Sequence, residues 1–318
     1  MRFADRPVRV RVPATSANLG PGYDSFGLAL ARHDEVTAAV TGGGLDIELA
    51  GDQTEQVPLD ESHLVVRSMR ACLDLLGRQP PGLRLRCVNR IPHGRGLGSS
   101  AAAIVAGIEL ARGLHPDGRA LLDDAGALAL ASRLEGHPDN VAACLFGGLT
   151  VAWLATDGTA RAARLTPTGI RPVVFIPPDR SATVTARAVL PATVPHPDAA
   201  FNAARAALLP LALTGRPELL LAATEDRLHQ GYRAAGMPAS AELVEQLRSE
   251  RIAAVISGAG PTVLALTVAG QAGRATDRCP AGWECAELAP STGALAEEVG
   301  EPLRQWPDDS SSPWPTGE

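Results

Sequence analysis

The chain has 318 residues, of which 45% are hydrophobic, 20% charged and 3% aromatic. This length fits roughly two domains of about 150 residues each, and the hydrophobic content excludes disorder throughout the chain. A formal net charge of −6 provides no broad cationic field, so we expect no nucleic-acid partner and no binding to an anionic membrane. The chain contains no lysine, so all 29 of its Lys and Arg residues are arginine, which excludes a Walker A lysine and lysine Schiff-base catalysis.

The cysteines and the N-terminus both bear on cellular location. The five cysteines are odd in number and scattered, with no CxxC pair and no Cys/His cluster at zinc-ligand spacing. The first residues lack the apolar core of a signal peptide, and no apolar run of 18 residues follows. We therefore expect reduced thiols, no membrane association and a cytoplasmic location.

The periodicity of apolar residues predicts the secondary structure. Strands are predicted at residues 8–12, 45–49, 83–87, 147–154, 172–176, 252–256 and 263–268. Helices are predicted at residues 62–76 with Ser62 as the cap, 101–111, 199–213 and 217–232. This order indicates an α+β protein with a domain boundary near residue 155. The end of the chain, residues 306–318, is rich in Pro, Ser and acids and is predicted to be a disordered tail.

A glycine-rich segment, PHGRGLGSSAAA at residues 92–103, lies between a predicted strand and a predicted helix. Glycines allow backbone N–H groups to turn inward around an anion, and the N-terminus of the helix adds partial positive charge. The segment therefore predicts a phosphate site that needs no lysine. The alternative is an ordinary glycine turn with Ser99 or Ser100 as the helix cap.

Two further segments concentrate unusual residues. EGHPDN at residues 135–140 places two carboxylates, an imidazole and an amide within six residues, although Asp139 and Asn140 also suit a simple turn. SGAGPT at residues 257–262 lies between two apolar strands. Its Gly258 and Gly260 permit another group to approach the backbone closely, and a tight turn is the alternative interpretation.

These segments resemble a known family. VPATSANLGPGYDSFGLAL (residues 12–30), IPHGRGLGSSAA (91–102), EGHPDNVAACLFGG (135–148) and SGAGPT occur in the order of the signature regions of the GHMP small-molecule kinases. The first two segments, together with TARAVLP (185–191) and DRLHQGYR (226–233), are most similar to the homoserine kinases among them. The resemblance extends from residue 8 to about residue 268.

The resemblance implies a two-domain GHMP kinase fold. Residues 1–155 would form an N-terminal ATP-binding domain like the second domain of ribosomal protein S5, with an unusual left-handed crossover. Residues 156–305 would form a ferredoxin-like C-terminal domain, with the nucleotide held between the two. The implied reaction is the ATP-dependent phosphorylation of the side-chain hydroxyl of L-homoserine to O-phospho-L-homoserine, in threonine biosynthesis.

Other functions remain open at this point. One is a kinase for threonine or another small hydroxy amino acid, and a second is a ligand sensor that keeps this fold without turnover. A Rossmann dehydrogenase is excluded because the glycine segment follows about 90 residues of other structure and Glu109 comes too early to bind a ribose. The oligomeric state stays open, with a homodimer as one candidate.

The resemblance also implies how ATP and Mg²⁺ bind. The ATP phosphates would lie on Pro92, His93, Gly94, Arg95, Gly96, Leu97, Gly98, Ser99, Ser100, Ala101 and Ala102. Ser100 and Glu135 would bind Mg²⁺, since a hydroxyl and a carboxylate supply the oxygen ligands that this hard cation prefers. Ser99 would donate a hydrogen bond to a phosphate.

For the acceptor, the resemblance assigns one group of residues to each end of the amino acid. The alcohol and amino end would be held by Asn18 and Asp24 with help from His137, and the carboxylate by Arg187 and Arg233. This suits an amino acid, whose ammonium favours an anion and whose carboxylate favours a bidentate guanidinium. Arg227 is the alternative to Arg233.

No side chain stands out as an obligatory base. Positioning the reactants supplies about 7 to 11 kcal/mol, more than the roughly 3 to 5.5 kcal/mol of a general base, and phosphoryl transfer depends mainly on alignment and charge stabilisation. We therefore expect direct in-line transfer. Asp24 would orient the hydroxyl, and Asn140 would lie near the γ-phosphate.

Overall fold

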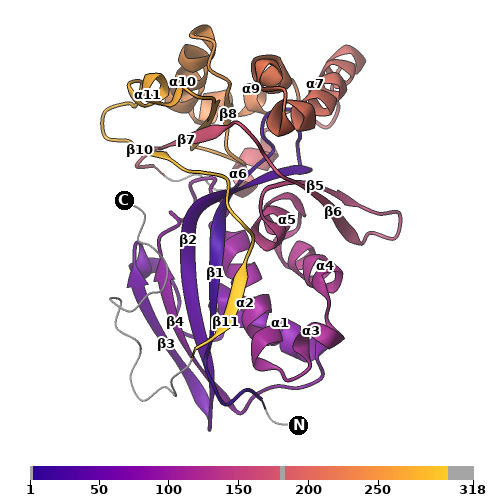
Figure 1. The fold of residues 1–318 in the computed structure, drawn as a ribbon, viewed down its shortest axis with the longest axis vertical. Coiled ribbons are helices and arrows are strands. Elements are labelled where there is room, and N and C mark those ends of the chain that lie inside the picture. The colour runs from indigo at the N-terminus through magenta and orange to yellow at the C-terminus, as the bar shows by residue number, and fades with distance from the viewer. Residues whose placement is uncertain (1–2, 180–182, 300–318) are drawn as a thin grey trace.

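The computed structural model describes residues 3–179 and 183–299, and these form two β-sheets with associated helices (Figure 1). The strands are β1 (Val8–Ala17), β2 (Phe26–Thr41), β3 (Gly44–Gly51), β4 (Gly82–Asn89), β5 (Leu149–Leu154), β6 (Ala160–Leu165), β7 (Arg171–Ile176), β8 (Ala254–Ile256), β9 (Val263–Thr267), β10 (Glu284–Glu287) and β11 (Leu295–Glu298). The α-helices are α1 (Leu64–Leu75), α2 (Ser99–Leu114), α3 (Gly118–Leu121), α4 (Asp124–Glu135), α5 (Asp139–Phe146), α6 (Thr183–Ala188), α7 (His196–Thr214), α8 (Leu220–Ala223), α9 (Gln230–Arg233), α10 (Pro238–Ser249) and α11 (Ala272–Thr276). Short 3-10 turns are η1 (Thr54–Gln56), η2 (Pro217–Leu219) and η3 (Ala234–Gly236).

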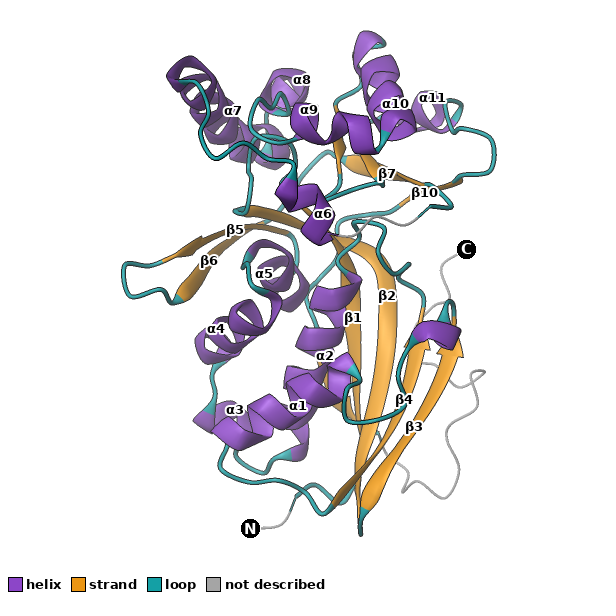
Figure 2. Cartoon of the chain, turned by 180° about the vertical axis from the view of Figure 1, so that it is seen from behind, coloured by secondary structure: helices purple, strands orange, loops and turns teal. Residues whose placement is uncertain are grey.

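The first sheet has the strand order β11-β1-β2-β4-β3, and β5 extends it by pairing with β2 and β6. Its pairs are antiparallel except β3–β4, which is parallel and connected through α1. Helices α2 and α5 pack on one face, and α1 and α4 lie beside α2 (Figure 2). Along β4, Leu83 and Leu85 are buried on the helix side while Arg84 points outward to Asp46 at 2.7 Å. The alternation of apolar and charged residues along the strand thus determines which face of the sheet packs against the core.

The second sheet has the order β10-β7-β9-β8, with every pair antiparallel. Helices α10 and α11 pack on it and enclose a separate apolar cluster that includes Phe175, Leu247 and Val263, each fully buried. The α+β class is confirmed. The division of the chain at residue 155 remains a prediction, and β6 and β11, which follow that residue, both belong to the first sheet.

The seven predicted strands and three of the four predicted helices are present, with small shifts at their ends. The predicted Ser62 cap is wrong, because Nδ1 of His63 accepts the hydrogen bond from the N–H of Val65 at 3.2 Å and Ser62 bonds to Asp60 instead. The continuous helix predicted at 217–232 is also wrong. It is broken between α8 and α9, where the carboxylate of Asp226 accepts backbone hydrogen bonds from residues 228, 229 and 230.

Two further expectations concern the end of the chain and membrane association. The predicted disordered tail, residues 306–318, lies outside the described residues. Within the described residues, none of the helices combines the length and the apolar character needed to cross a membrane.

Candidate active site

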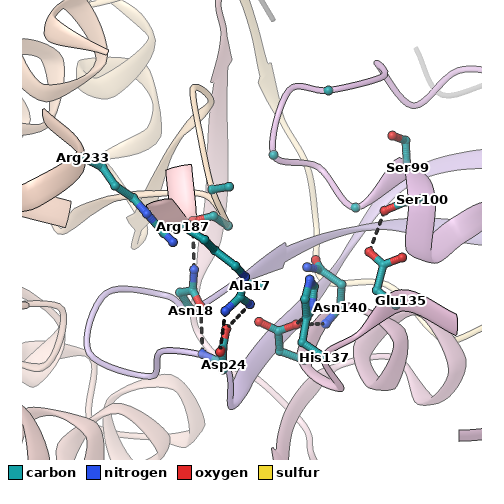
Figure 3. Close-up of a pocket in the computed structure, with 16 residues that line it drawn as sticks. Ala17, Asn18, Asp24, Ser99, Ser100, Glu135, His137, Asn140, Arg187 and Arg233 are labelled. Carbon is teal, nitrogen blue, oxygen red and sulfur yellow. Dashed lines mark hydrogen bonds and ion pairs between the residues drawn. The ribbon is translucent and has the colours of Figure 1, made fainter. Parts of the chain in front are cut away.

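A cavity of about 230 Å³ is lined by residues from both halves of the chain. Its walls come from the end of β1, the segment 94–100, the segment 135–140, α6, α9 and residues 258–259 (Figure 3). Segments far apart in the sequence therefore meet here. The cavity gathers most of the residues that the sequence analysis singled out.

The glycine loop, residues 92–98, forms one wall and leads directly into α2. Gly98 is the N-cap residue of α2 with φ +69°, and a Cβ there would lie 1.9 Å from Oγ1 of Thr15. Because α2 begins at Ser99, its first backbone N–H groups have no acceptor within the helix and can bind an anion. The alternative of Ser99 or Ser100 as the cap is wrong, since Gly98 occupies that position.

The segment SGAGPT holds the glycine loop in place from the second sheet. Oγ of Ser257 donates to the carbonyl of Gly96 at 2.6 Å, and the N–H of Gly258 donates to the carbonyl of Ala17 at 3.0 Å. A Cβ on Gly96 would lie 2.3 Å from the carbonyl oxygen of Ser257. The close backbone approach predicted for this segment thus occurs where Ser257 meets Gly96, whereas a Cβ on Gly258 would lie 3.5 Å from its nearest neighbour, the carbonyl oxygen of Gly96.

Two oxygen-bearing side chains meet at the start of α2. Oγ of Ser100 donates to Oε1 of Glu135 at 2.6 Å, and Glu135 is the last residue of α4 (Figure 3). Burial raises the pKa of Glu135, although the hydrogen bond from Ser100 and the nearby His137 oppose that shift. Hydroxyl and carboxylate oxygens are suitable ligands for Mg²⁺, which usually keeps water and phosphate oxygens as its other ligands. Within residues 3–179 and 183–299, no three His, Cys, Asp or Glu side chains are arranged to hold a metal ion by themselves.

The start of α5 orders an imidazole and an amide at the cavity. Oδ1 of the buried Asp139 lies 2.6 Å from Nδ1 of His137 and accepts the N–H of Asn140 at 2.7 Å. Burial lowers the pKa of His137, but the hydrogen bond and charge of Asp139 and the charge of Glu135 outweigh this and raise it. Thr15 donates to the amide oxygen of Asn140 at 2.8 Å, which leaves the amide nitrogen as the group that can donate to a ligand.

The loop after β1 carries Asn18 and Asp24, both with positive φ. The amide of Asn18 is engaged at both ends, since Nδ2 donates to the carbonyl of Gly258 at 2.9 Å and Oδ1 accepts the N–H of Asp24 at 3.0 Å. Asn18 thus ties this loop to the second sheet. The carboxylate of Asp24 faces the cavity and binds the guanidinium of Arg187 through both oxygens.

Two arginines reach the cavity from the helices of the second half. Arg187 on α6 is half-exposed, and its bond to Asp24 is the leading cause that raises its pKa. Arg233 at the end of α9 is 3% exposed and donates from Nε to the carbonyl of Ala186 at 2.9 Å. Arg227 lies elsewhere, paired with Asp198 at 2.9 Å, so Arg233 is the one of the two that lines the cavity.

A second cavity, of about 280 Å³, adjoins the start of α2 and was not foreseen from the sequence. It shares Ser99 and Ser100 with the first cavity and is otherwise lined largely by apolar residues such as Val12, Val65 and Ala102. His93 lines this second cavity rather than the first. Its residues come from five separate segments, so no local motif could have indicated it.

The predicted phosphate residues therefore divide into four groups. Gly94, Gly96 and Gly98 line the first cavity, Ser99 and Ser100 line both, and His93 and Ala102 line the second. The remaining four line neither cavity: Pro92, Arg95, Leu97 and Ala101. Arg95 instead donates to the carbonyl of Asp179 at 2.6 Å, while Leu97 and Ala101 are fully buried. Asp139, which the sequence analysis singled out within EGHPDN but assigned no role in the site, also lines the first cavity.

Comparison with known proteins identifies the family. Residues 63–148 match the N-terminal domain of the GHMP kinases, and residues 201–285 match the C-terminal GHMP kinase domain. The homoserine kinase of Streptomyces coelicolor is 58% identical over 287 residues, which cover 90% of this chain and 93% of that protein. The chain belongs to the homoserine kinase family of GHMP kinases. A homoserine kinase of Streptomyces avermitilis is similar to the same degree, at 58% identity over 90% of this chain and 94% of its own length.

A solved structure shows the same fold. The crystal structure of the homoserine kinase from Cytophaga hutchinsonii superimposes with a TM-score of 0.78 at 24% identity, covering 92% of this chain and 98% of that one. The predicted GHMP kinase fold is thereby confirmed. As a GHMP kinase, the protein is an ATP-dependent phosphotransferase. The dehydrogenase alternative stays excluded.

Proposed function

We propose that this protein transfers the γ-phosphoryl group of ATP to the side-chain hydroxyl of L-homoserine and so forms O-phospho-L-homoserine. The observation that carries this proposal is the arrangement of one cavity, which has anion-binding backbone groups at one end and an Asp with two Arg side chains at the other. A zwitterionic acceptor with a hydroxyl group matches that second end in charge.

The nucleotide is proposed to span the two cavities. The free N–H groups at the start of α2 bind the triphosphate, supported by the glycine loop, and no lysine is needed. The apolar second cavity adjoins this point and suits a nucleobase. Ser100 and Glu135 would hold Mg²⁺, which neutralises phosphate charge when it is bound.

The acceptor is proposed to lie between Asp24 and the two arginines. Each oxygen of the Asp24 carboxylate has two acceptor positions, so Arg187 leaves room for the ammonium or hydroxyl of the acceptor. Arg187 and Arg233 supply the guanidinium groups for its carboxylate. Asn18 holds the loop that carries Asp24, and this supports a positioning role for it.

Transfer is proposed to occur in line, without an obligatory base. Asp24 orients the hydroxyl, the amide nitrogen of Asn140 donates to the γ-phosphoryl group, and His137 donates to the acceptor or the phosphoryl oxygens. Buried partners, Thr15 for Asn140 and Asp139 for His137, hold these groups in position, and positioning of the reactants can supply about 7 to 11 kcal/mol of the barrier reduction.

A steady-state assay tests the proposed reaction. Purified protein is given ATP, Mg²⁺ and separately L-homoserine, L-threonine, L-serine or no acceptor, with ADP release measured and the product identified by mass spectrometry. We expect the highest kcat/KM with L-homoserine. A higher value with threonine would support the alternative kinase, and nucleotide binding without turnover would support the sensor. The homodimer and the cytoplasmic location stay predictions.

A further inference from the structure

Tyr23 lies between Gly22 and Asp24 in the loop after β1 and contacts both arginines of the cavity. Its ring centre is 5.6 Å from Cζ of Arg187 and 5.5 Å from Cζ of Arg233. The ring of the fully buried His229 packs against it, with centroids 5.3 Å apart. One aromatic ring thus contacts both guanidinium groups and is itself held by a buried neighbour.

The hydroxyl of Tyr23 also forms a hydrogen bond, in addition to the contacts of its ring with the guanidinium groups. Nη1 of Arg187 donates to the Tyr23 hydroxyl at 3.0 Å and also donates to Oδ2 of Asp24 at 3.0 Å. Arg233 donates from Nε to the carbonyl of Ala186, the residue next to Arg187. The two arginines are therefore fixed relative to each other through Tyr23 and through α6.

Two guanidinium groups at one end of a cavity repel each other, and the surroundings must compensate for this. Burial lowers the pKa of Arg233, the charge of Arg187 lowers it further, and Tyr23 and Asp24 raise it. The face of an aromatic ring attracts cations, by about 0.5 to 2 kcal/mol according to its exposure. Tyr23 is thus one of the groups that stabilise the two neighbouring guanidinium groups before any acceptor binds.

We propose that Tyr23 is a positioning residue that holds Arg187 and Arg233 at the spacing needed to bind one carboxylate of the acceptor. This inference rests on the proposed function, in which the two arginines bind that carboxylate. It assigns to Tyr23 a part in acceptor specificity, because an acceptor without a carboxylate gains nothing from the pair. Tyr23 is not among the residues that line the cavity, so its part is exerted through the two arginines.

The test uses variants that remove one feature at a time. Tyr23→Phe removes the hydroxyl and keeps the ring, Tyr23→Leu removes both, and Tyr232→Phe removes the same atom from the only other tyrosine, which is 40% exposed. Each is assayed with L-homoserine and with 3-aminopropan-1-ol, which is homoserine without its carboxylate. Where the amino alcohol turns over too slowly, its competitive inhibition constant is measured instead.

We expect Tyr23→Phe to raise the KM for homoserine about 3- to 10-fold, with kcat and the KM for ATP within about 2-fold of the unaltered protein. Tyr23→Leu has a larger effect in the same direction. Neither Tyr23 variant changes the KM or the inhibition constant for 3-aminopropan-1-ol. Tyr232→Phe changes none of these values. In an Arg187→Ala background, Tyr23→Phe adds little, because its partner is already absent.

Several outcomes would overturn the inference. The first is an equal rise in KM for both acceptors, and the second is a fall in kcat without a change in KM. The third is the same rise in KM when Tyr23→Phe is added to the Arg187→Ala variant. If Arg187→Ala raises the acceptor KM but Tyr23→Phe does not, the inference fails and the proposed function stands. If Arg187→Ala leaves the acceptor KM unchanged, the proposed carboxylate site fails together with the inference.

Discussion

The carboxylate of Asp24 accepts hydrogen bonds from both terminal nitrogens of Arg187, at 2.7 and 3.0 Å, although the two residues are 163 positions apart in the sequence. Both side chains remain more than one-third exposed at the cavity. The proposed acceptor groups are thus already paired with each other. A zwitterion can join this pair by matching its ammonium to Asp24 and its carboxylate to Arg187.

Asp24→Ala should lower kcat with L-homoserine about 100-fold or more, because the hydroxyl loses the group that orients it. The measurement is kcat at saturating ATP and acceptor. Asp198→Ala is the matched control, since Asp198 also pairs with an arginine but outside the cavity. Turnover by Asp24→Ala close to that of the unaltered protein would contradict the assignment.

Arg187→Ala should raise the KM for the acceptor about 10- to 100-fold while leaving the KM for ATP nearly unchanged, since a charged hydrogen bond contributes about 1.5 to 3 kcal/mol. Arg233→Ala should do the same and also lower the melting temperature, because its buried guanidinium satisfies the carbonyl of Ala186. Arg227→Ala serves as the control. An equal rise in KM with Arg227→Ala would argue against the placement of the carboxylate.

Gly98→Ala should weaken ATP binding and lower the free energy of unfolding by about 2 kcal/mol or more, through backbone strain and a clash with Thr15. Gly158→Ala is matched in backbone strain, with φ +78°, but a Cβ there meets no atom within 4 Å. The control should lose only about 1 kcal/mol and keep its KM for ATP. Denaturant unfolding and ATP titration provide the two readouts, and equal effects of both substitutions would contradict the prediction.

His137 should make stability depend on pH. Its pKa in the folded protein is raised above the ordinary value near 6.5, so its stabilising contribution is complete below that value and is lost as the pH rises through the raised pKa. The difference in unfolding free energy between the protein and His137→Gln should therefore be larger at about pH 6 than at about pH 9. Urea unfolding across this range measures it, with the exposed His196→Gln as the control. A difference that does not vary with pH would disprove the coupling to Asp139.

The sequence predicted elements whose pattern is local and missed those that depend on partners elsewhere. Val8, Val10 and Val12 alternate strictly and are buried as expected. The long strand β2 was missed because Arg32 and Asp34 interrupt its apolar alternation, and both have distant partners: Arg32 bonds to Glu284, and Asp34 accepts the N–H of Arg90. Because these partners are distant in the sequence, their contacts with β2 can be identified only in the folded structure.

The features of the candidate site also divide into those that a local motif predicts and those that depend on distant segments. Gly98 and Ser100 belong to one continuous motif, so the sequence was enough to bring them together. The second cavity, the bond between Asn18 and Gly258, and the position of Arg233 rather than Arg227 at the first cavity all depend on contacts between segments that are distant in the sequence. The contact between Asp139 and His137 could have been predicted from the sequence, because a carboxylate two residues after a histidine at a turn can form a hydrogen bond with its ring.

Strand β11 has a consequence for how the chain acquires its structure. Glu298 pairs with Val8, so the last described strand completes the edge of a sheet that the first strand begins. During synthesis, the outer edge of β1 stays without this neighbour until residues 295–298 have left the ribosome. An exposed strand edge invites pairing with other chains, so shortening the protein before Leu295 should promote aggregation rather than yield a stable smaller enzyme.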